Sequence, residues 1–220
     1  MEEQAQPNDV AFYQSYAHLT ARIFVRPLIG TSIRPNHLTM LRLATGLAAC
    51  ALLAAGSRRT AFWSGIFWMV SCMLDRADGE LARMANLRSD SGKMLDFCSD
   101  MILDSVWFLC AGIGLRHSSL GDSATVLGVL SCGSMLLALW SSELFEGLSP
   151  RGVKAFDFVQ GAKRFHPDDA LFLLAPLTWL GVLVPTLVAA SVCTPIFAVG
   201  LTVRYFALRR RVARAQSVVQ

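Results

Sequence analysis

Residues 60–104 of the chain read TAFWSGIFWMVSCMLDRADGELARMANLRSDSGKMLDFCSDMILD. This stretch holds two largely apolar segments separated by a charged turn near residues 84–90. Each segment is long enough, as a helix, to cross a hydrocarbon core about 30 Å thick. The two segments nevertheless carry five aspartates: Asp75, Asp78, Asp96, Asp100 and Asp104. The stretch therefore predicts two membrane helices whose carboxylates need compensation, because charge is costly inside a bilayer.

Helical periodicity places these carboxylates on two faces. Positions 75, 78, 79, 82 and 83 share one face of the first helix, because residues three and four apart lie above one another. On the second helix the repeat is every four residues, at Gly92, Asp96, Asp100 and Asp104. Since the connecting turn is short, we expect the helices to be antiparallel neighbours. Four carboxylates would then converge near one membrane boundary.

Clustered carboxylates repel one another unless protons or cations intervene. An all-oxygen ligand set favours Mg²⁺, Mn²⁺ or Ca²⁺ over zinc, and a pair of such ions could clamp a pyrophosphate. The alternative is an ion-pair network with Arg76, Arg83 and Arg88. Small residues on the same faces favour a ligand site, because they leave room for close approach to the backbone: Gly79, Ala82 and Gly92. Asp104 is expected to orient Asp100 or bind an arginine, and Glu80 and Asp90 to be solvated.

The rest of the chain is equally apolar. Of its 220 residues, 54% are hydrophobic and 16% charged, whereas soluble proteins are about a quarter charged. The pattern predicts an all-α polytopic membrane protein with six transmembrane helices. We place them at 37–56, 60–83, 91–115, 122–146, 168–184 and 187–208, with an uncharged break near Pro185.

The ends of the chain are polar. We expect a disordered tail at 1–9, an amphipathic interfacial helix within 10–35, a membrane domain at 36–208 and a basic tail at 209–220. Asn36 would cap the first span. The net charge is +4, and the basic residues lie between apolar blocks. This placement indicates contact with anionic membrane lipids rather than nucleic acid, and it puts both termini in the cytoplasm.

The aspartates belong to a longer pattern. Residues 75–100 match D-x2-D-G-x2-A-R-x8-G-x3-D-x3-D at every fixed position, and Arg34-Pro35-Asn36-His37-Leu38-Thr39 precedes the first span. The pattern resembles the signature of the CDP-alcohol phosphotransferase family. The resemblance implies an enzyme of phospholipid biosynthesis that moves a phosphoryl-alcohol group, such as phosphatidyl from CDP-diacylglycerol, onto an acceptor hydroxyl and releases CMP. It also implies a homodimer, which we expect in a bacterial inner membrane with a cytoplasmic active site.

The resemblance implies roles for individual residues. Asp75, Asp78, Asp96 and Asp100 would hold two Mg²⁺ or Mn²⁺ ions, and Asp100 would also be the general base. The donor nucleotide and phosphates would contact Asn36, Thr39, Gly79, Ala82, Arg83 and Ser89. Three of these residues have a plain structural alternative. In that alternative, Asn36 caps a helix, Thr39 bonds a backbone carbonyl and Ser89 forms a turn, and none of the three contacts the donor.

The acceptor is less defined. Lys163, Arg164 and Arg204 are candidate acceptor contacts, which would suit glycerol 3-phosphate, inositol or inositol phosphate, although contact with anionic lipid would also explain them. A transferase that joins a soluble CDP-alcohol to a lipid acceptor would use the same signature. Two other classes place carboxylates on membrane helices, namely intramembrane prenyltransferases and cation-binding transport proteins. Neither of them explains Gly79, Ala82 and Arg83.

Overall fold

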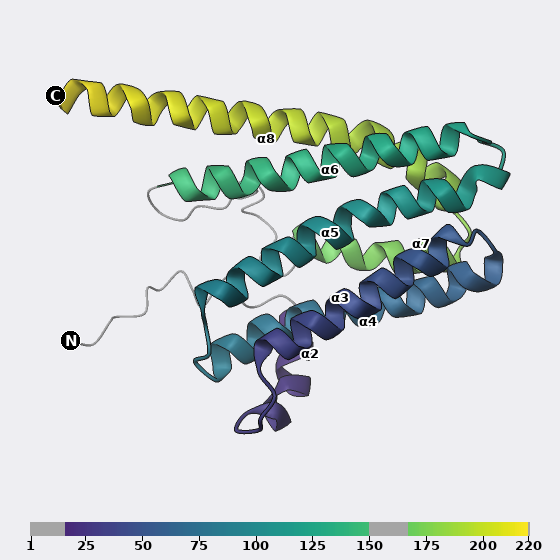
Figure 1. The fold of residues 1–220 in the computed structure, drawn as a ribbon, viewed down its shortest axis with the longest axis horizontal. Coiled ribbons are helices and arrows are strands. Elements are labelled where there is room, and N and C mark those ends of the chain that lie inside the picture. Colours follow the sequence, from purple (N-terminus) through teal and green to yellow (C-terminus); the bar gives the residue numbers. More distant parts are fainter. Residues whose placement is uncertain (1–15, 150–166, 220) are drawn as a thin grey trace.

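A computed structural model describes residues 16–149 and 167–219 of the chain, and these residues are helical almost throughout (Figure 1). The long helices are α3 (Pro35–Ala54), α4 (Arg58–Met84), α5 (Asp90–Gly114), α6 (Ser123–Leu148) and α8 (Leu183–Val219). The short elements are α2 (Tyr16–Val25), η1 (Arg26–Leu28), η2 (Leu115–His117), η3 (Pro167–Leu173) and α7 (Leu174–Trp179). The predicted all-helical class is confirmed for the described residues. The expected tail at 1–9 lies outside them.

Four helical segments are long and apolar enough to cross a membrane: Pro35–Ala54, Asp90–His117, Ser123–Leu148 and Leu183–Arg214. They correspond to four of the six predicted spans. The second predicted span corresponds to α4, whose last third carries the signature charges. The fifth corresponds to η3 and α7, which end at a turn where Gly181 has a φ of 71°. The break therefore lies at Gly181, and Pro185 stands in the first turn of α8, where a proline is tolerated.

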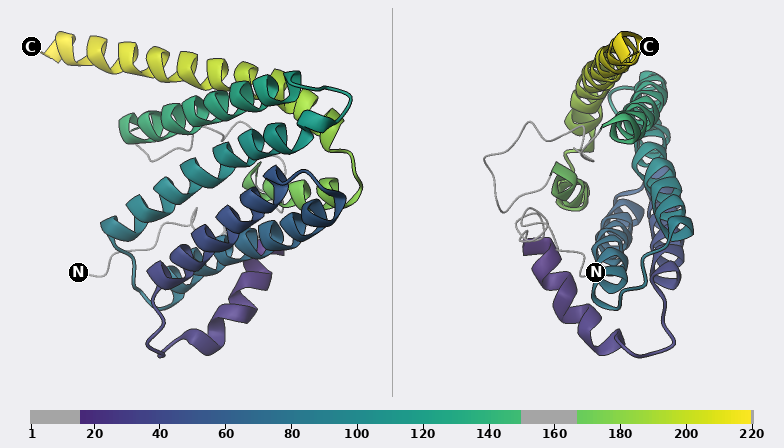
Figure 2. Two further views of the ribbon diagram at one scale, coloured as in Figure 1. Left: turned by 45° about the vertical axis from the view of Figure 1, so that its right-hand side comes forward. Right: turned by 90° about the vertical axis from the view of Figure 1, so that its left-hand side faces the viewer.

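The long helices form a layer in which each packs against its neighbours (Figures 1 and 2). α3 packs against both α4 and α5, α5 packs against α6, and α6 packs against α8, while α2 and α7 lie on α4. α4 and α5 run antiparallel, as predicted, but they make little direct backbone contact. Gly46 of α3 explains this arrangement. Because it has no side chain, α3 can approach both Leu103 of α5 and Ser71 of α4.

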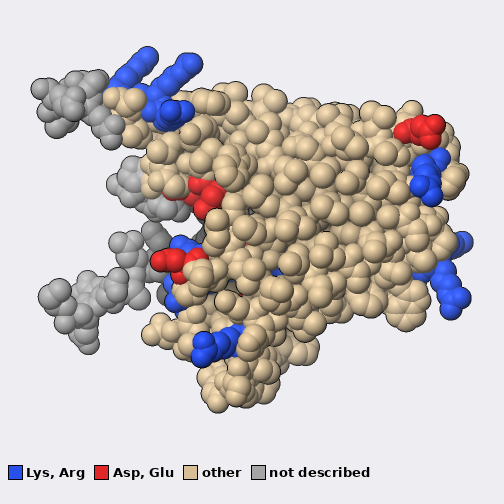
Figure 3. All heavy atoms as spheres, in the orientation of Figure 1, with Lys and Arg blue, Asp and Glu red and all other residues tan. Residues whose placement is uncertain are grey.

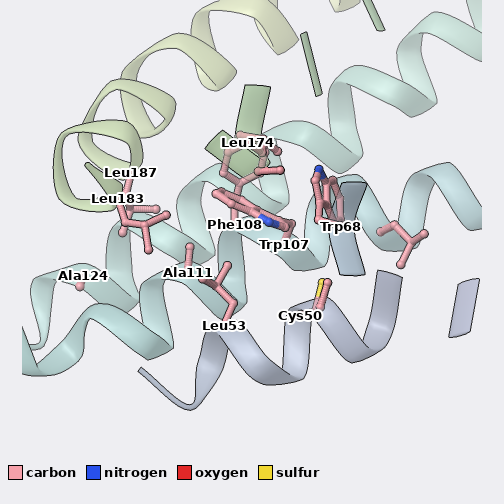
Figure 4. Close-up of a cluster of buried hydrophobic side chains, with 13 residues drawn as sticks. Cys50, Leu53, Trp68, Trp107, Phe108, Ala111, Ala124, Leu174, Leu183 and Leu187 are labelled. Carbon is pink, nitrogen blue, oxygen red and sulfur yellow. The ribbon is translucent and has the colours of Figure 1, made fainter. Parts of the chain in front are cut away.

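Aromatic side chains join the helices on either side of α3 (Figure 4). Trp68 of α4 and Trp107 of α5 are almost fully buried, with ring centroids 6.0 Å apart, and Phe108 packs edge-on against Trp107. The indole Nε1 of Trp68 donates a hydrogen bond to the carbonyl of Leu171 at 3.0 Å, which fixes η3 against α4. Charged residues gather towards the two ends of the molecule, and a broad uncharged band lies between them (Figure 3). This distribution suits a membrane protein.

Two glycines bring α5 and α6 into backbone contact, and they give a first testable prediction. A Cβ added at Gly112 would lie 2.6 Å from the carbonyl oxygen of Ala124 and 2.9 Å from the Cα of Gly128. Both atoms belong to the backbone and cannot rotate away. Gly112→Ala is therefore expected to destabilise the fold by about 1–3 kcal/mol, although alanine favours helix. This corresponds to about 2–4 °C per kcal/mol in the thermal midpoint for a chain of this length.

The matched control for this prediction is Gly133→Ala on α6, where an added Cβ would meet nothing within 4 Å. Its unfolding midpoint in detergent should stay at or slightly above that of the wild type. Equal midpoints for the two variants would contradict the close packing of α5 on α6.

Candidate metal and nucleotide site

Three of the predicted metal ligands come together between α4 and α5. Asp75, Asp78 and Asp96 each offer a carboxylate oxygen, and these atoms lie within 4.8 Å of one another. Asp78 is buried and the other two are partly exposed. Three carboxylate oxygens at this separation fit a hard divalent cation such as Mg²⁺ or Mn²⁺. Asp100 lies one turn further along α5 and joins the group through an arginine.

That arginine is Arg42 of α3, to which the sequence pattern assigned no role. Its side chain is 5% exposed, and its Nη1 lies 2.7 Å from Asp75 Oδ1 and 2.9 Å from Asp96 Oδ1. Its Nη2 donates to Asp100 Oδ1. Arg42 is a basic residue inside an apolar span, and it follows Asn36 and Thr39 at intervals of three residues, on the same side of the helix. This spacing could have indicated that Arg42 belongs to the site.

The alternative prediction, that arginines pair with the carboxylates, is therefore correct in part. The central arginine is Arg42 and not one of those named from the sequence. Arg76 pairs with its neighbour Asp75 at 2.9 Å, and Arg83 pairs with Glu80. The expectation that Glu80 is solvated is wrong, because its side chain is 1% exposed. A buried carboxylate needs hydrogen-bonding partners, and two arginines supply them.

A cavity of about 520 Å³ opens beside the carboxylates. Its size falls within the range of small-molecule sites, roughly 300–1,000 Å³. Asp78 and Asp96 line it, and so do all six residues predicted to contact the donor: Asn36, Thr39, Gly79, Ala82, Arg83 and Ser89. Residues of α3, of α4 and of the turn before α5 thus face one space. Arg88 and Lys93 also line the cavity, so it offers positive charge as well as carboxylates.

The starts of α3 and α5 meet at this cavity. Ser89 is the N-cap of α5, because its Oγ accepts a hydrogen bond from the backbone N–H of Gly92 at 3.1 Å. Asn36 is not a cap. Arg34 precedes α3, and its N–H donates to His37 Nδ1. A Cβ at Gly92 would lie 3.2 Å from Asn36 Oδ1, so this glycine makes room for the Asn36 amide.

Thr39 connects this entrance to the carboxylates. Its hydroxyl lies 2.6 Å from Asp78 Oδ2, to which it donates, and 3.3 Å from the carbonyl of Pro35. The shorter contact is to the carboxylate, so Thr39 does more than satisfy a backbone carbonyl. It fixes one oxygen of Asp78 and leaves the other for a ligand.

Asp75 and Arg42 also line a second cavity of about 20 Å³, together with buried Asp104. This volume is enough for about one water molecule. Asp104 thus belongs to the carboxylate stripe of α5 but lies outside the group formed by Asp75, Asp78 and Asp96.

Of the predicted acceptor residues, the structure describes Arg204, which does not lie at this site. Lys163 and Arg164 lie outside the described residues. Arg204 of α8 places its guanidinium 5.2 Å from the ring centroid of Phe145 on α6, and it lines neither cavity. Nearby, the hydroxyls of Ser141 and Thr202 are 2.9 Å apart. Arg204 therefore helps to join α6 to α8.

The apolar helices indicate a membrane protein, and its larger cavity is lined by both carboxylates and positive groups. The sequence model of the CDP-alcohol phosphatidyltransferase family matches residues 32–160, which is more than half of the chain and includes every residue that lines the larger cavity. The chain belongs to this family, and it is a transferase for phosphate-containing groups. A comparison with curated proteins gave no match. Family membership argues against a prenyltransferase or a cation transporter.

Proposed function

We propose that the protein transfers a phosphatidyl group from CDP-diacylglycerol to a small alcohol and releases CMP, with two Mg²⁺ or Mn²⁺ ions bound. The observation that carries this proposal is the larger cavity, where six predicted donor contacts and the carboxylates of Asp78 and Asp96 face one space. The positive groups of Arg83, Arg88 and Lys93 suit a pyrophosphate. The carboxylates suit the cations that a pyrophosphate binds.

The proposal includes six membrane crossings. α4 has 27 residues and packs against α3, so we propose that it crosses the membrane despite its charged last turns. η3 and α7 form the remaining crossing. The carboxylates then lie near the cytoplasmic boundary, on the side where most basic residues fall. We place the protein in a bacterial inner membrane as a homodimer, in keeping with its family.

The chemistry follows from the placement of the side chains. Bound metal would neutralise the pyrophosphate and polarise its phosphorus. Asp75, Asp78 and Asp96 would hold the ions, and Thr39 would keep Asp78 oriented. Arg83 would contact the donor phosphates from the cavity wall. A carboxylate oxygen of Asp100 accepts the acceptor's proton while the acceptor oxygen bonds to the phosphorus distal to cytidine, and the bond from that phosphorus to CMP breaks.

The acceptor is proposed from charge alone. A phosphorylated acceptor such as glycerol 3-phosphate or inositol phosphate would suit Lys163 and Arg164, which follow α6 in the sequence. Inositol itself is a further candidate. Arg204 has less support as an acceptor contact, because its guanidinium lies over Phe145. A soluble CDP-alcohol with a lipid acceptor would use the same carboxylates and the same cavity.

CMP release by the purified protein in detergent tests this function. Each reaction would contain CDP-diacylglycerol and Mn²⁺ or Mg²⁺, with glycerol 3-phosphate, inositol, inositol phosphate or serine added separately. We expect release that requires both the metal and one particular acceptor, and that stops when EDTA is added. Folded protein that releases no CMP with any of these acceptors would contradict the proposed donor. The same assay with soluble CDP-alcohols and lipid acceptors would then follow.

A further inference from the structure

Glu80 lies inside the signature, between Gly79 and Leu81, and the proposed reaction assigns it no role. Its side chain is 1% exposed. The next residue, Leu81, belongs to a small apolar cluster in which Val25 of α2 packs against Leu38 and Leu81. A carboxylate in such surroundings is held only by strong, charge-assisted hydrogen bonds.

Two arginines from different parts of the structure supply these bonds. Arg22 of α2 donates from Nε to Glu80 Oε2 at 2.9 Å. Arg83 of α4 donates from Nη2 to Glu80 Oε1 at 2.5 Å. One carboxylate therefore joins a helix that lies outside the main layer to an arginine that lines the larger cavity.

α2 itself contributes no residue to the lining of the larger cavity. It is seated on α4 by Ala21 and Val25, which are almost fully buried, and by Arg22. Its other face exposes Ile23 and Phe24. Any effect of α2 on the cavity must therefore pass through the residues beneath it. Glu80 is such a residue, because it contacts both Arg22 of α2 and Arg83 of the cavity wall.

We propose that Glu80 is a positioning residue, which holds the Arg83 guanidinium in place for the donor phosphates and makes that position depend on the seating of α2. This inference rests on the proposed function, because it takes the phosphates of a cytidine nucleotide as the ligand of Arg83. Arginine has a long side chain whose rotamer freedom must be lost on binding. An arginine already held by a carboxylate loses less of it.

The test measures the affinity of CDP, which carries the pyrophosphate but no transferable alcohol. Calorimetric titration in detergent with Mn²⁺ would compare the wild type with Glu80→Gln and Arg22→Gln. A charged hydrogen bond is worth about tenfold or more in an equilibrium constant, so Glu80→Gln should raise the Kd of CDP about tenfold. Arg22→Gln should raise it in the same direction by a smaller factor, and Arg22→Lys should restore part of the loss.

Arg26→Gln is the matched control, because Arg26 is exposed one turn after Arg22 and its loss makes the same change of charge. Its Kd should equal that of the wild type. The double variant Arg22→Gln/Glu80→Gln should bind CDP no more weakly than Glu80→Gln alone, since both changes act through one carboxylate. If Glu80 had only a structural role, these variants would unfold at a lower temperature, but the Kd of CDP would not rise in the two single variants and stay non-additive in the double variant.

Two outcomes would overturn the inference, and they are distinguishable. If the wild type binds CDP and both Glu80→Gln and Arg22→Gln bind it equally well, Glu80 does not position Arg83 and the proposed function stands. If the wild type binds no CDP in the presence of Mn²⁺, the proposed function and the inference fail together.

Discussion

Asp100→Asn is expected to lower the rate of CMP release by about 1,000-fold, which is within the usual contribution of a general base. Asparagine has the same shape as aspartate but cannot accept the proton of an acceptor hydroxyl. Asp100 is suited to this role because its side chain is 37% exposed and lies outside the tighter group formed by Asp75, Asp78 and Asp96. The variant should still bind CDP, since Asp100 does not line the larger cavity.

The measurement is CMP release under saturating donor and acceptor, with the Kd of CDP determined in parallel. Asp122→Asn is the control, because Asp122 is exposed in the turn before α6 and makes the same chemical change far along the chain from the signature. Its rate should match that of the wild type. If Asp100→Asn kept more than about a tenth of the activity, a general-base role with the usual contribution would be excluded.

Arg42→Gln is expected to destabilise the metal-free protein by about 3 kcal/mol, the lower end of the cost of breaking a buried ion pair. The arginine serves Asp75, Asp96 and Asp100 at once, so its loss leaves three carboxylates without their shared cation. The lower end applies because Asp96 and Asp100 are partly exposed to water. Mn²⁺ should then stabilise the variant more than it stabilises the wild type, because the metal no longer binds beside a fixed positive charge.

Thermal unfolding in detergent, with EDTA and with Mn²⁺, measures both effects. Arg59→Gln makes the same change of charge at an exposed position at the start of α4 and should resemble the wild type in both conditions. If Arg42→Gln unfolded at the same temperature as Arg59→Gln, Arg42 would not be the internal cation of the carboxylates. An equal response to Mn²⁺ in the variant and the wild type would show that Arg42 does not oppose metal binding.

The features that could be predicted from the sequence depend on neighbours along the chain. Spacing of three and four residues placed Asp75 and Asp78 on one face, and polar breaks placed the ends of α3, α4, α5 and α6 within about two residues. Both signals come from within one helix, where geometry is fixed by the backbone. The six donor residues were predicted from the family resemblance, and the larger cavity gathers them.

The features that were missed depend on packing between helices. Periodicity shows that α4 and α5 have carboxylate faces, but it does not show that α3 lies against both and brings Arg42 between them. The sequence predicts a solvated Glu80, because nothing in its own helix reveals that Arg22 of α2 reaches it. The helix type of the fifth predicted span could not be foreseen either, since hydropathy does not distinguish a 3₁₀ segment from an α-helix.

The proposed fifth crossing, formed by η3 and α7, is short for the lipid around it. At about 2.0 Å per residue in η3 and 1.5 Å in α7, Pro167–Trp179 extends about 23 Å, which is shorter than the roughly 30 Å hydrocarbon core. A bilayer adapts to a short wall by thinning beside it. Leu171 and Phe172 of η3 line the small cavity next to Asp75 and Arg42. As the proposed fifth crossing, this element would therefore bring lipid head groups closer to Asp75, and the proposed diacyl donor would need to rise less far out of the membrane to react.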